Sequence, residues 1–150
     1  AQAGAKKRGH SYGRQKALEY LRAAGFACND SSLSHADYVA GLRQSQFVAA
    51  PRGNGVSTFR VWEALAHGAV PIVLRTHEGS HDGLYRSLPV VQIGPDVVRP
   101  VKHEGWTEVT PQFLREERGR IERLILTDGY DMAPMYLPYW LARLFNQSFI

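Results

Sequence analysis

The sequence lacks the residue patterns that build most covalent and metal sites. Cys28 is the only cysteine among 150 residues, so neither an intrachain disulfide nor a cysteine-based zinc site can form. The six histidines contain no HExxH motif. His77 and His81 are four residues apart, but Gly79 and Ser80 between them favour a loop over a helix. We therefore expect no metal site.

Long apolar runs and internal repeats are also missing. No stretch approaches the roughly 18 apolar residues that span a bilayer, and no low-complexity tract or linker divides the chain. The opening AQAGAKKRGHSYGRQK has neither an initiator methionine nor the apolar core of a signal peptide. With 44% hydrophobic and 21% charged residues, the composition is typical of a globular fold. We expect one domain over residues 1–150, as part of a longer protein.

The charge balance is basic, with 18 Lys and Arg against 14 Asp and Glu, a net charge of +4. Such an excess suits an anionic ligand, a nucleic acid or a membrane surface. One dense basic run stands near the start, and Tyr12 is its only aromatic residue; the basic residues are Lys6, Lys7, Arg8, Arg14 and Lys16. Nucleic-acid binding favours aromatics interleaved with basic residues. We expect a solvated segment here and no nucleic-acid partner.

Short β-branched runs alternate with helical patterns along the chain. The patterns predict helices over residues 14–24, 34–42, 58–67, 110–126 and 137–149, and strands over 26–28, 46–50, 70–74 and 90–93. Residues 75–89, rich in Gly, His and Ser, are predicted to form an irregular loop. Strands recurring roughly every 20 residues with helices between them are typical of βαβ units. We predict an α/β fold, a Rossmann-like parallel sheet with helices on both faces.

Helix termini carry recognisable signals. Gly25 and Gly68 follow helical patterns and predict helix ends. Ser34 followed by Asp37 is a variant capping box. Thr110 with Pro111 predicts a cap and a first helical position.

The loop PRGNG, which follows the predicted strand QFVAA, is the strongest candidate site. Ligands of open α/β sheets bind outside the carboxyl ends of the strands. Gly53 and Gly55 allow a sharp turn and close approach of a ligand. Ser57 and Thr58 can cap the next helix, whose N-terminus then faces an anion. The loop is neither a Walker loop nor a GxGxxG motif.

Arg60 and Glu63 lie three residues apart within that helix and share a face. Arg60 would stand near a phosphate at the helix start, and Glu63 can accept hydrogen bonds from a ribose diol. Val61, Trp62 and Leu65 turn toward the sheet. The alternative is a surface Arg–Glu ion pair, worth about a few tenths of a kcal/mol.

The stretch FVAAPRGNGVSTFRVWEALAHGAVPIVL (47–74) resembles the donor-site segment of the exostosin-like glycosyltransferases. That family's pattern runs hydrophobic strand, P-R-G, short loop, S/T-x-R, F/W-E-A-L and G-x-x-P-V. Weaker similarities follow in LPVVQI (88–93), WTEVTPQFL (106–114) and YWL (139–141). Arg14 matches a basic residue that heads the family domain's first helix.

The resemblance implies the C-terminal half of a GT-B glycosyltransferase, which binds the nucleotide diphosphate of an activated sugar. Arg60 would lie against the diphosphate and Glu63 against the ribose. A UDP-sugar is the favoured donor, the transferred group is hexosyl or similar, and no metal or other cofactor is expected. The donor-binding residues expected on these grounds are Arg14, Arg52, Gly53, Asn54, Ser57, Thr58, Arg60 and Glu63.

The resemblance does not assign the acceptor site or the catalytic residues to this chain. A glycan or other acceptor would bind an N-terminal domain that residues 1–150 do not contain, and the catalytic residues stay unassigned. We expect the chain alone to bind a donor without transferring sugar. A eukaryotic source would imply a Golgi membrane location, and any other source the cytoplasm. The main alternative is a non-catalytic α/β module that binds a nucleotide or phosphate.

Overall fold

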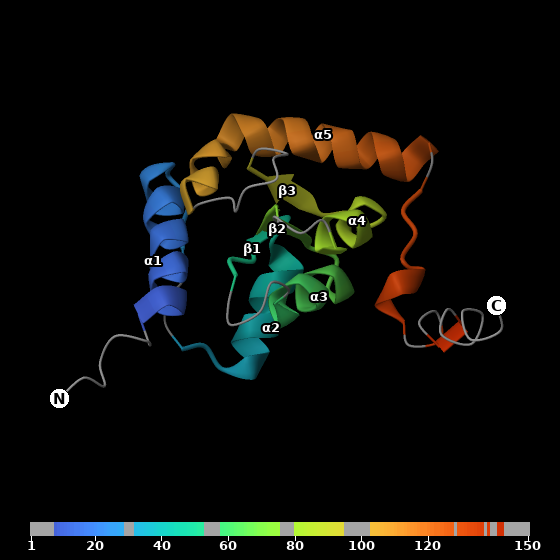
Figure 1. Ribbon diagram of the computed structural model, residues 1–150, viewed down its shortest axis with the longest axis horizontal. Coiled ribbons are helices and arrows are strands. Elements are labelled where there is room, and N and C mark those ends of the chain that lie inside the picture. Colours follow the sequence, from blue (N-terminus) through green and yellow to red (C-terminus); the bar gives the residue numbers. More distant parts are fainter. Residues whose placement is uncertain are drawn as a thin grey trace.

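The computed structural model describes residues 8–28, 32–52, 58–75, 80–94, 103–127, 129–136, 138 and 141–142 (Figure 1). Within them the elements are α1 (Arg8–Ala23), α2 (His35–Gln44), β1 (Phe47–Ala49), α3 (Phe59–Ala66), β2 (Val70–Leu74), α4 (Ser80–Arg86), β3 (Val91–Ile93), η1 (His103–Glu108), α5 (Pro111–Thr127) and η2 (Ala133–Met135), where η marks a 3-10 helix. The strands form one parallel sheet in the order β1-β2-β3. The predicted α/β class is confirmed.

β2 is the central strand and is paired on both edges. The Val70 N–H donates to the Gln46 carbonyl on the β1 side at 2.9 Å. Successive N–H groups of a strand point to opposite neighbours, so Pro71 faces the β3 side. Pairing with β3 begins only at Ile72, which lies opposite Val91. The missing N–H of Pro71 therefore removes no bond from the ladder, which explains a proline in a central strand.

α3 and α4 connect neighbouring strands and lie on one face of the sheet. Parallel strands in sequential order, joined by right-handed crossovers, place each connecting helix on the same side. Val61 and Leu65 of α3 and Tyr85 of α4 pack with Val73 of β2 in one buried cluster, the α3-side core. Trp62 is packed against that core and lies 6.3 Å from Tyr85 between ring centroids.

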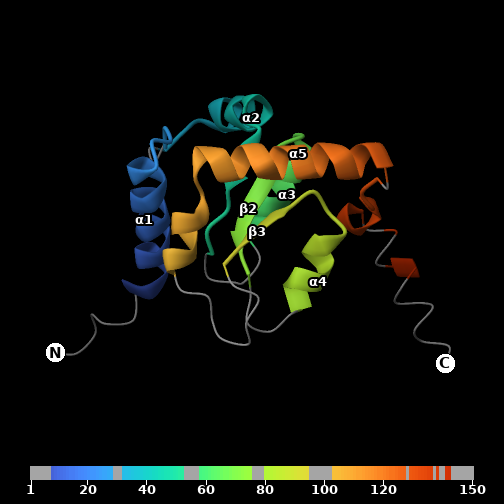
Figure 2. The same ribbon diagram turned by 90° about the horizontal axis from the view of Figure 1, so that it is seen from above.

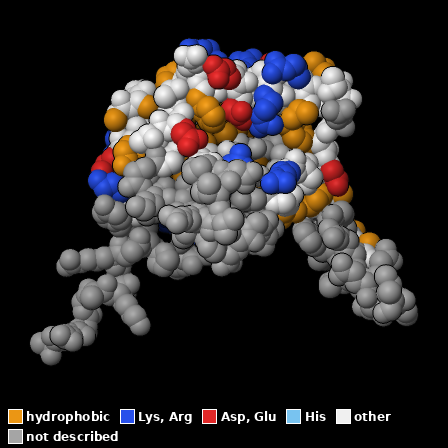
Figure 3. Space-filling model, turned by 45° about the horizontal axis from the view of Figure 1, so that its top comes forward, with side chains coloured by type: hydrophobic (Ala, Val, Ile, Leu, Met, Phe, Trp, Pro, Cys, Tyr) orange, Lys and Arg blue, Asp and Glu red, His pale blue; other side chains and the backbone are white. Residues whose placement is uncertain are grey.

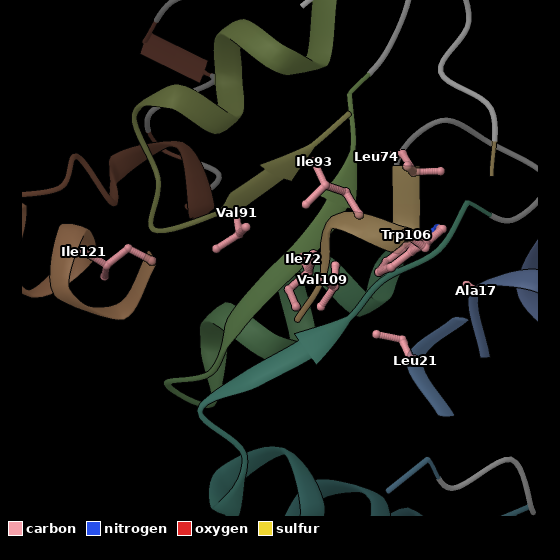
Figure 4. Close-up of a cluster of buried hydrophobic side chains, with 9 residues drawn as sticks. All are labelled: Ala17, Leu21, Ile72, Leu74, Val91, Ile93, Trp106, Val109 and Ile121. Carbon is pink, nitrogen blue, oxygen red and sulfur yellow. The ribbon is translucent and has the colours of Figure 1, made fainter. Parts of the chain in front are cut away.

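The opposite face is covered by α1, η1 and α5, so helices lie on both faces, as predicted. Figure 1 shows α5 above the strands and α3 below them, and Figure 2 gives the view from above. The buried cluster on this face, the α5-side core, is drawn in Figure 4 and contains Ala17, Leu21, Ile72, Leu74, Val91, Ile93, Trp106, Val109 and Ile121. Trp106 is completely buried and is the largest side chain in the cluster.

Two predicted helix starts and the helix end at Gly68 agree with the observed caps, but α1 begins at Arg8, six residues before the predicted start, so Arg8, Arg14 and Lys16 of the basic run lie on this helix. The Ser34 hydroxyl accepts from the Asp37 N–H at 3.1 Å and begins α2. The Thr110 hydroxyl accepts from the Phe113 N–H at 3.1 Å and begins α5. Gly68 has φ +81° after α3, in the left-handed region that glycine enters at low cost.

The predicted strand at residues 26–28 is wrong. These residues continue from the end of α1 and belong to no strand. The Phe26 N–H donates to the Leu21 carbonyl and the Gly25 N–H to the Arg22 carbonyl, both at 3.0 Å, which is a Schellman cap. The cap uses the Phe26 donor that a ladder would need. Phe26 and Cys28 instead pack against the α5-side core.

The predicted irregular loop at residues 75–89 is also wrong in part, because α4 lies within it. Tyr85 and Leu88 are almost fully buried in the α3-side core. Their burial stabilises a helix in a segment whose Gly, His and Ser content predicts a loop. The predicted helix over residues 137–149 lies largely outside the described residues.

The surface carries charges of both signs. Figure 3 brings the α5 side toward the viewer and shows basic, acidic and apolar side chains interspersed. On α5, Arg118 pairs with Glu122 and Arg120 with Glu117, each at 2.7 Å. Within the described helices, none is both long and apolar enough to cross a membrane.

Replacing Trp106 with alanine is expected to destabilise the chain strongly. The substitution leaves a cavity in the α5-side core, and such changes cost about 3–5 kcal/mol. Urea denaturation followed by circular dichroism measures the change in unfolding free energy. The matched control is Leu126→Ala at the exposed end of α5, where the change should stay within about 0.5 kcal/mol. Equal effects of the two substitutions would contradict the assigned core.

Candidate functional site

The carboxyl ends of β1 and β2 meet at one edge of the sheet, and an arginine follows each strand. Ala49 of β1 and Ile72 of β2 are register partners. Arg52 follows Ala49 by three residues, and Arg75 follows Ile72 by three residues. The Arg75 N–H donates to the Ile93 carbonyl at 2.9 Å, so the β2–β3 ladder continues to Arg75. Both arginine side chains are half-buried.

Arg75 lies on the same side of the sheet as α3. Side chains two residues apart in a strand share a face. Val73 belongs to the α3-side core, and Arg75 follows it by two residues. Arg52 precedes the connection that leads into α3. A positively charged edge of the sheet therefore adjoins the beginning of this helix.

α3 begins at Thr58, whose backbone is extended, with φ −116° and ψ 146°. Thr58 occupies the N-cap position, but its side chain caps no N–H group. Its Oγ1 is buried and has no hydrogen-bond partner in the described part of the chain. A buried hydroxyl without a partner costs free energy. The helix N-terminus thus carries both its positive dipole end and an unsatisfied hydroxyl.

α3 divides into a buried face and an exposed face. Val61, Ala64 and Leu65 are buried, which confirms that this face turns toward the sheet. Arg60 and Glu63 are exposed on the other side, as predicted. Phe59, in the first turn, is 87% exposed, which is unusual for a large apolar side chain.

Glu63 is held by a residue from another helix. The Tyr38 hydroxyl of α2 donates to Glu63 Oε2 at 2.7 Å. Burial raises the pKa of Tyr38 above its ordinary value, the bond to Glu63 raises it further, and Arg60 opposes both. Since the ordinary pKa of a phenol already lies well above neutral pH, Tyr38 keeps its proton there and acts as the donor.

The surface ion pair that was the alternative for Arg60 and Glu63 is not formed. In the described part of the chain, no ion pair joins these two side chains. Both side chains instead neighbour the Tyr38 phenol. Arg60, Glu63 and Tyr38 thus form one polar cluster, the Tyr38 cluster.

The structure places the remaining predicted site residues as follows. Arg52 and Thr58 lie at the sheet edge and at the beginning of α3. Gly53, Asn54 and Ser57 lie outside the described residues. Arg14 is exposed on α1, whose buried residues pack in the α5-side core on the opposite face of the sheet.

Sequence reasoning missed Tyr38, Phe59 and Arg75. Arg75 could have been identified from the rule that the carboxyl ends of parallel strands share an edge, because it directly follows a predicted strand. Phe59 stands inside the motif, but its exposure depends on how α3 is rotated. Tyr38 gave no signal, because its contact with Glu63 spans 25 residues between two helices.

No group of three or more His, Cys, Asp or Glu side chains suited to a metal ion occurs among the described residues. The polar groups gathered around α3 are cations, hydroxyls and one carboxylate. Such a set can neutralise an anion and accept hydrogen bonds from hydroxyl groups.

The chain matches the RXYLT1 C-terminal domain over residues 14–118. The match includes all three strands, α3 and the Tyr38 cluster. No curated protein and no solved structure matches the chain significantly. The match nevertheless covers well over half of the sequence, and the chain therefore belongs to the RXYLT1 C-terminal domain family, an exostosin-related xylosyltransferase family.

Proposed function

We propose that this chain is the donor-binding domain of a glycosyltransferase and holds a nucleoside-diphosphate sugar at the beginning of α3. The observation that carries the proposal is that Arg60 and Glu63 lie together, without an ion pair, on the exposed face of α3 next to the carboxyl edge of the sheet. Membership of a xylosyltransferase family supports transfer of a sugar.

The diphosphate binds at the N-terminus of α3. Arg60 contributes a guanidinium group in the first turn, and Thr58 contributes its buried, unpaired hydroxyl. Arg52 and Arg75 add positive charge at the sheet edge. Charge-assisted hydrogen bonds of this kind are short and strong, and a guanidinium can bind phosphate oxygens in pairs. The loop residues Gly53, Asn54 and Ser57 remain proposed donor ligands. Arg14 also remains one, and it would have to reach the carboxyl edge of the sheet from α1 on the opposite face.

The ribose binds to Glu63. A carboxylate accepts hydrogen bonds only, and two adjacent ribose hydroxyls offer two donors. Glu63 lies one helical turn beyond the diphosphate site, a separation suited to the neighbouring diphosphate and ribose of one nucleotide. The two residues therefore contact different parts of the same ligand.

The family indicates a pentose as the transferred group, where the sequence favoured a hexosyl or similar one, so we infer UDP-xylose as the donor. In the reaction the acceptor hydroxyl attacks C1 of the sugar, the bond from C1 to the diphosphate oxygen breaks, and UDP leaves. A base takes the hydroxyl proton. In a GT-B architecture the acceptor and this base belong to the facing N-terminal domain.

Transfer needs no metal in this proposal. The leaving diphosphate develops negative charge, and fixed cations and helix dipoles stabilise such charge in a preorganised site. Arg60, Arg52 and the N-terminus of α3 supply that stabilisation. The function is therefore metal-independent transfer of a sugar from a nucleotide donor.

Substitutions of Arg60 and Glu63 should affect different ligands. Arg60→Ala should weaken UDP binding by about 1.5–3 kcal/mol, the range for a hydrogen bond to a charged group. It should weaken uridine binding less, because uridine has no phosphate. Glu63→Gln should weaken both uridine and UDP, and should change the binding of 2′-deoxy-UDP little. Calorimetric titration of the full chain with the three ligands measures these affinities.

The matched controls lie on α5. Arg118→Ala and Glu122→Gln alter an exposed Arg–Glu pair on the other side of the sheet. These controls should leave all three affinities unchanged. Unchanged affinities in the Arg60 and Glu63 variants as well would exclude the donor site, and equal losses for every ligand would favour a general effect on folding.

Removal of divalent metal should leave nucleotide binding intact. The proposed phosphate ligands are arginines, a threonine hydroxyl and backbone N–H groups, and none of them is a carboxylate, the usual protein ligand of Mg²⁺ or Mn²⁺ beside a phosphate. Calorimetric titration with UDP in excess EDTA and in excess Mg²⁺ should give equal dissociation constants. A tenfold or greater loss of affinity in EDTA would show that a metal bridges the diphosphate.

A further inference from the structure

The contact between Tyr38 and Glu63 joins two helices outside both hydrophobic cores. Neither core contains Tyr38 or packs it at its margin. The only buried residue of α2 is Leu42, and Glu63 lies on the exposed face of α3. Packing therefore leaves the Glu63 carboxylate unconstrained, and the 2.7 Å hydrogen bond from the phenol is what orients it.

The first turn of α2 is itself fixed. The Ser34 hydroxyl accepts from the Asp37 N–H at 3.1 Å and donates to Asp37 Oδ2 at 2.6 Å. The Tyr38 N–H donates to the Ser34 carbonyl at 2.9 Å. This cap determines where the Tyr38 side chain leaves the backbone, so the phenol approaches Glu63 from an ordered turn.

The phenol and a ribose can bind Glu63 together. A carboxylate has two oxygens and about four acceptor sites. The phenol uses one site on Oε2, which leaves Oε1 and a second site on Oε2 for two ribose hydroxyls. We propose that Tyr38 is a positioning residue of the donor site, which holds the Glu63 carboxylate in the orientation that accepts the ribose diol. This inference rests on the proposed function.

The expected benefit is entropic. A glutamate on a helix surface samples several rotamers, and a ligand that fixes one of them loses affinity accordingly. Immobilising one such side chain changes affinity by about two- to tenfold. Tyr38 restricts the rotamers of Glu63 before the donor binds. Part of the entropy loss of this side chain therefore occurs on folding and does not reduce the affinity for the donor.

Tyr38→Phe tests the inference, because it removes the donor and keeps the ring. Uridine and UDP should bind about two- to tenfold more weakly, while 2′,3′-dideoxy-UDP, which lacks the diol, should bind as it does to the parent chain. In a Glu63→Ala background the same substitution should have no further effect on UDP. Tyr136→Phe, an exposed tyrosine beyond α5, is the matched control and should alter no affinity.

The outcomes separate this inference from the proposed function. If the parent chain binds UDP and Glu63→Gln weakens it, but Tyr38→Phe has no effect, the positioning role is wrong and the donor site stands. If Tyr38→Phe weakens diol-containing and diol-free ligands equally, Tyr38 is structural and the inference also fails. If the parent chain does not bind UDP, or Glu63→Gln binds normally, the proposed function fails and this inference fails with it.

Discussion

The fold depends on the burial of β2 on both faces and its pairing on both edges. Ile72 and Leu74 face the α5-side core, and Val73 faces the α3-side core. Two apolar faces require two layers of helices. A one-residue slip of such a strand would exchange one apolar face for the other, so polarity alone does not fix its register. The Schellman cap at Gly68 restricts such a slip, because the Ala69 N–H that closes the cap on the Ala64 carbonyl belongs to the residue directly before β2.

The same packing determines how the site residues are presented. α3 has eight residues, and its buried stripe of Val61, Ala64 and Leu65 fixes the rotation of the helix about its axis. Arg60 and Glu63 are exposed as a consequence. Since β1 ends immediately before the connection to α3, the sheet places the beginning of this helix at its carboxyl edge. Residues on a short, well-packed helix keep their relative positions better than residues on a loop.

Much of this could be predicted from the sequence, because the deciding signals are local. The buried run VPIVL, the cap at Ser34 and the glycine after α3 each act within a few residues, and the structure agrees with all three. Phe26 was misassigned because its N–H serves the cap of α1. α4 was missed because burial of Tyr85 in the tertiary structure stabilises it.

The candidate site likewise contains residues that local sequence signals identify and residues that only tertiary packing brings together. Arg60 and Glu63 share a helix, so their spacing alone placed them together. Tyr38 joins them only after α2 and α3 have packed, and no periodicity in a single sequence reports a contact between helices. Arg75 is intermediate between a residue found from local spacing and one found only after packing. Its position beside Arg52 follows from the register of β1 and β2, and that register can be derived only when the order of the strands is known.

The choice of tyrosine as the partner of Glu63 has an electrostatic consequence. A lysine or arginine at position 38 would orient the carboxylate equally well, but it would neutralise the negative charge that makes the oxygens strong acceptors. A protonated phenol orients Glu63 without adding charge. The ordinary pKa of a phenol already lies well above neutral pH, and burial raises the pKa of Tyr38 further. The absence of an Arg60–Glu63 ion pair has the same effect on both residues: the carboxylate keeps its charge for hydroxyl donors, and the guanidinium keeps its charge for an anion. In the proposed site, Tyr38 therefore allows opposite charges to stay near each other on one helix while each serves a different part of the ligand.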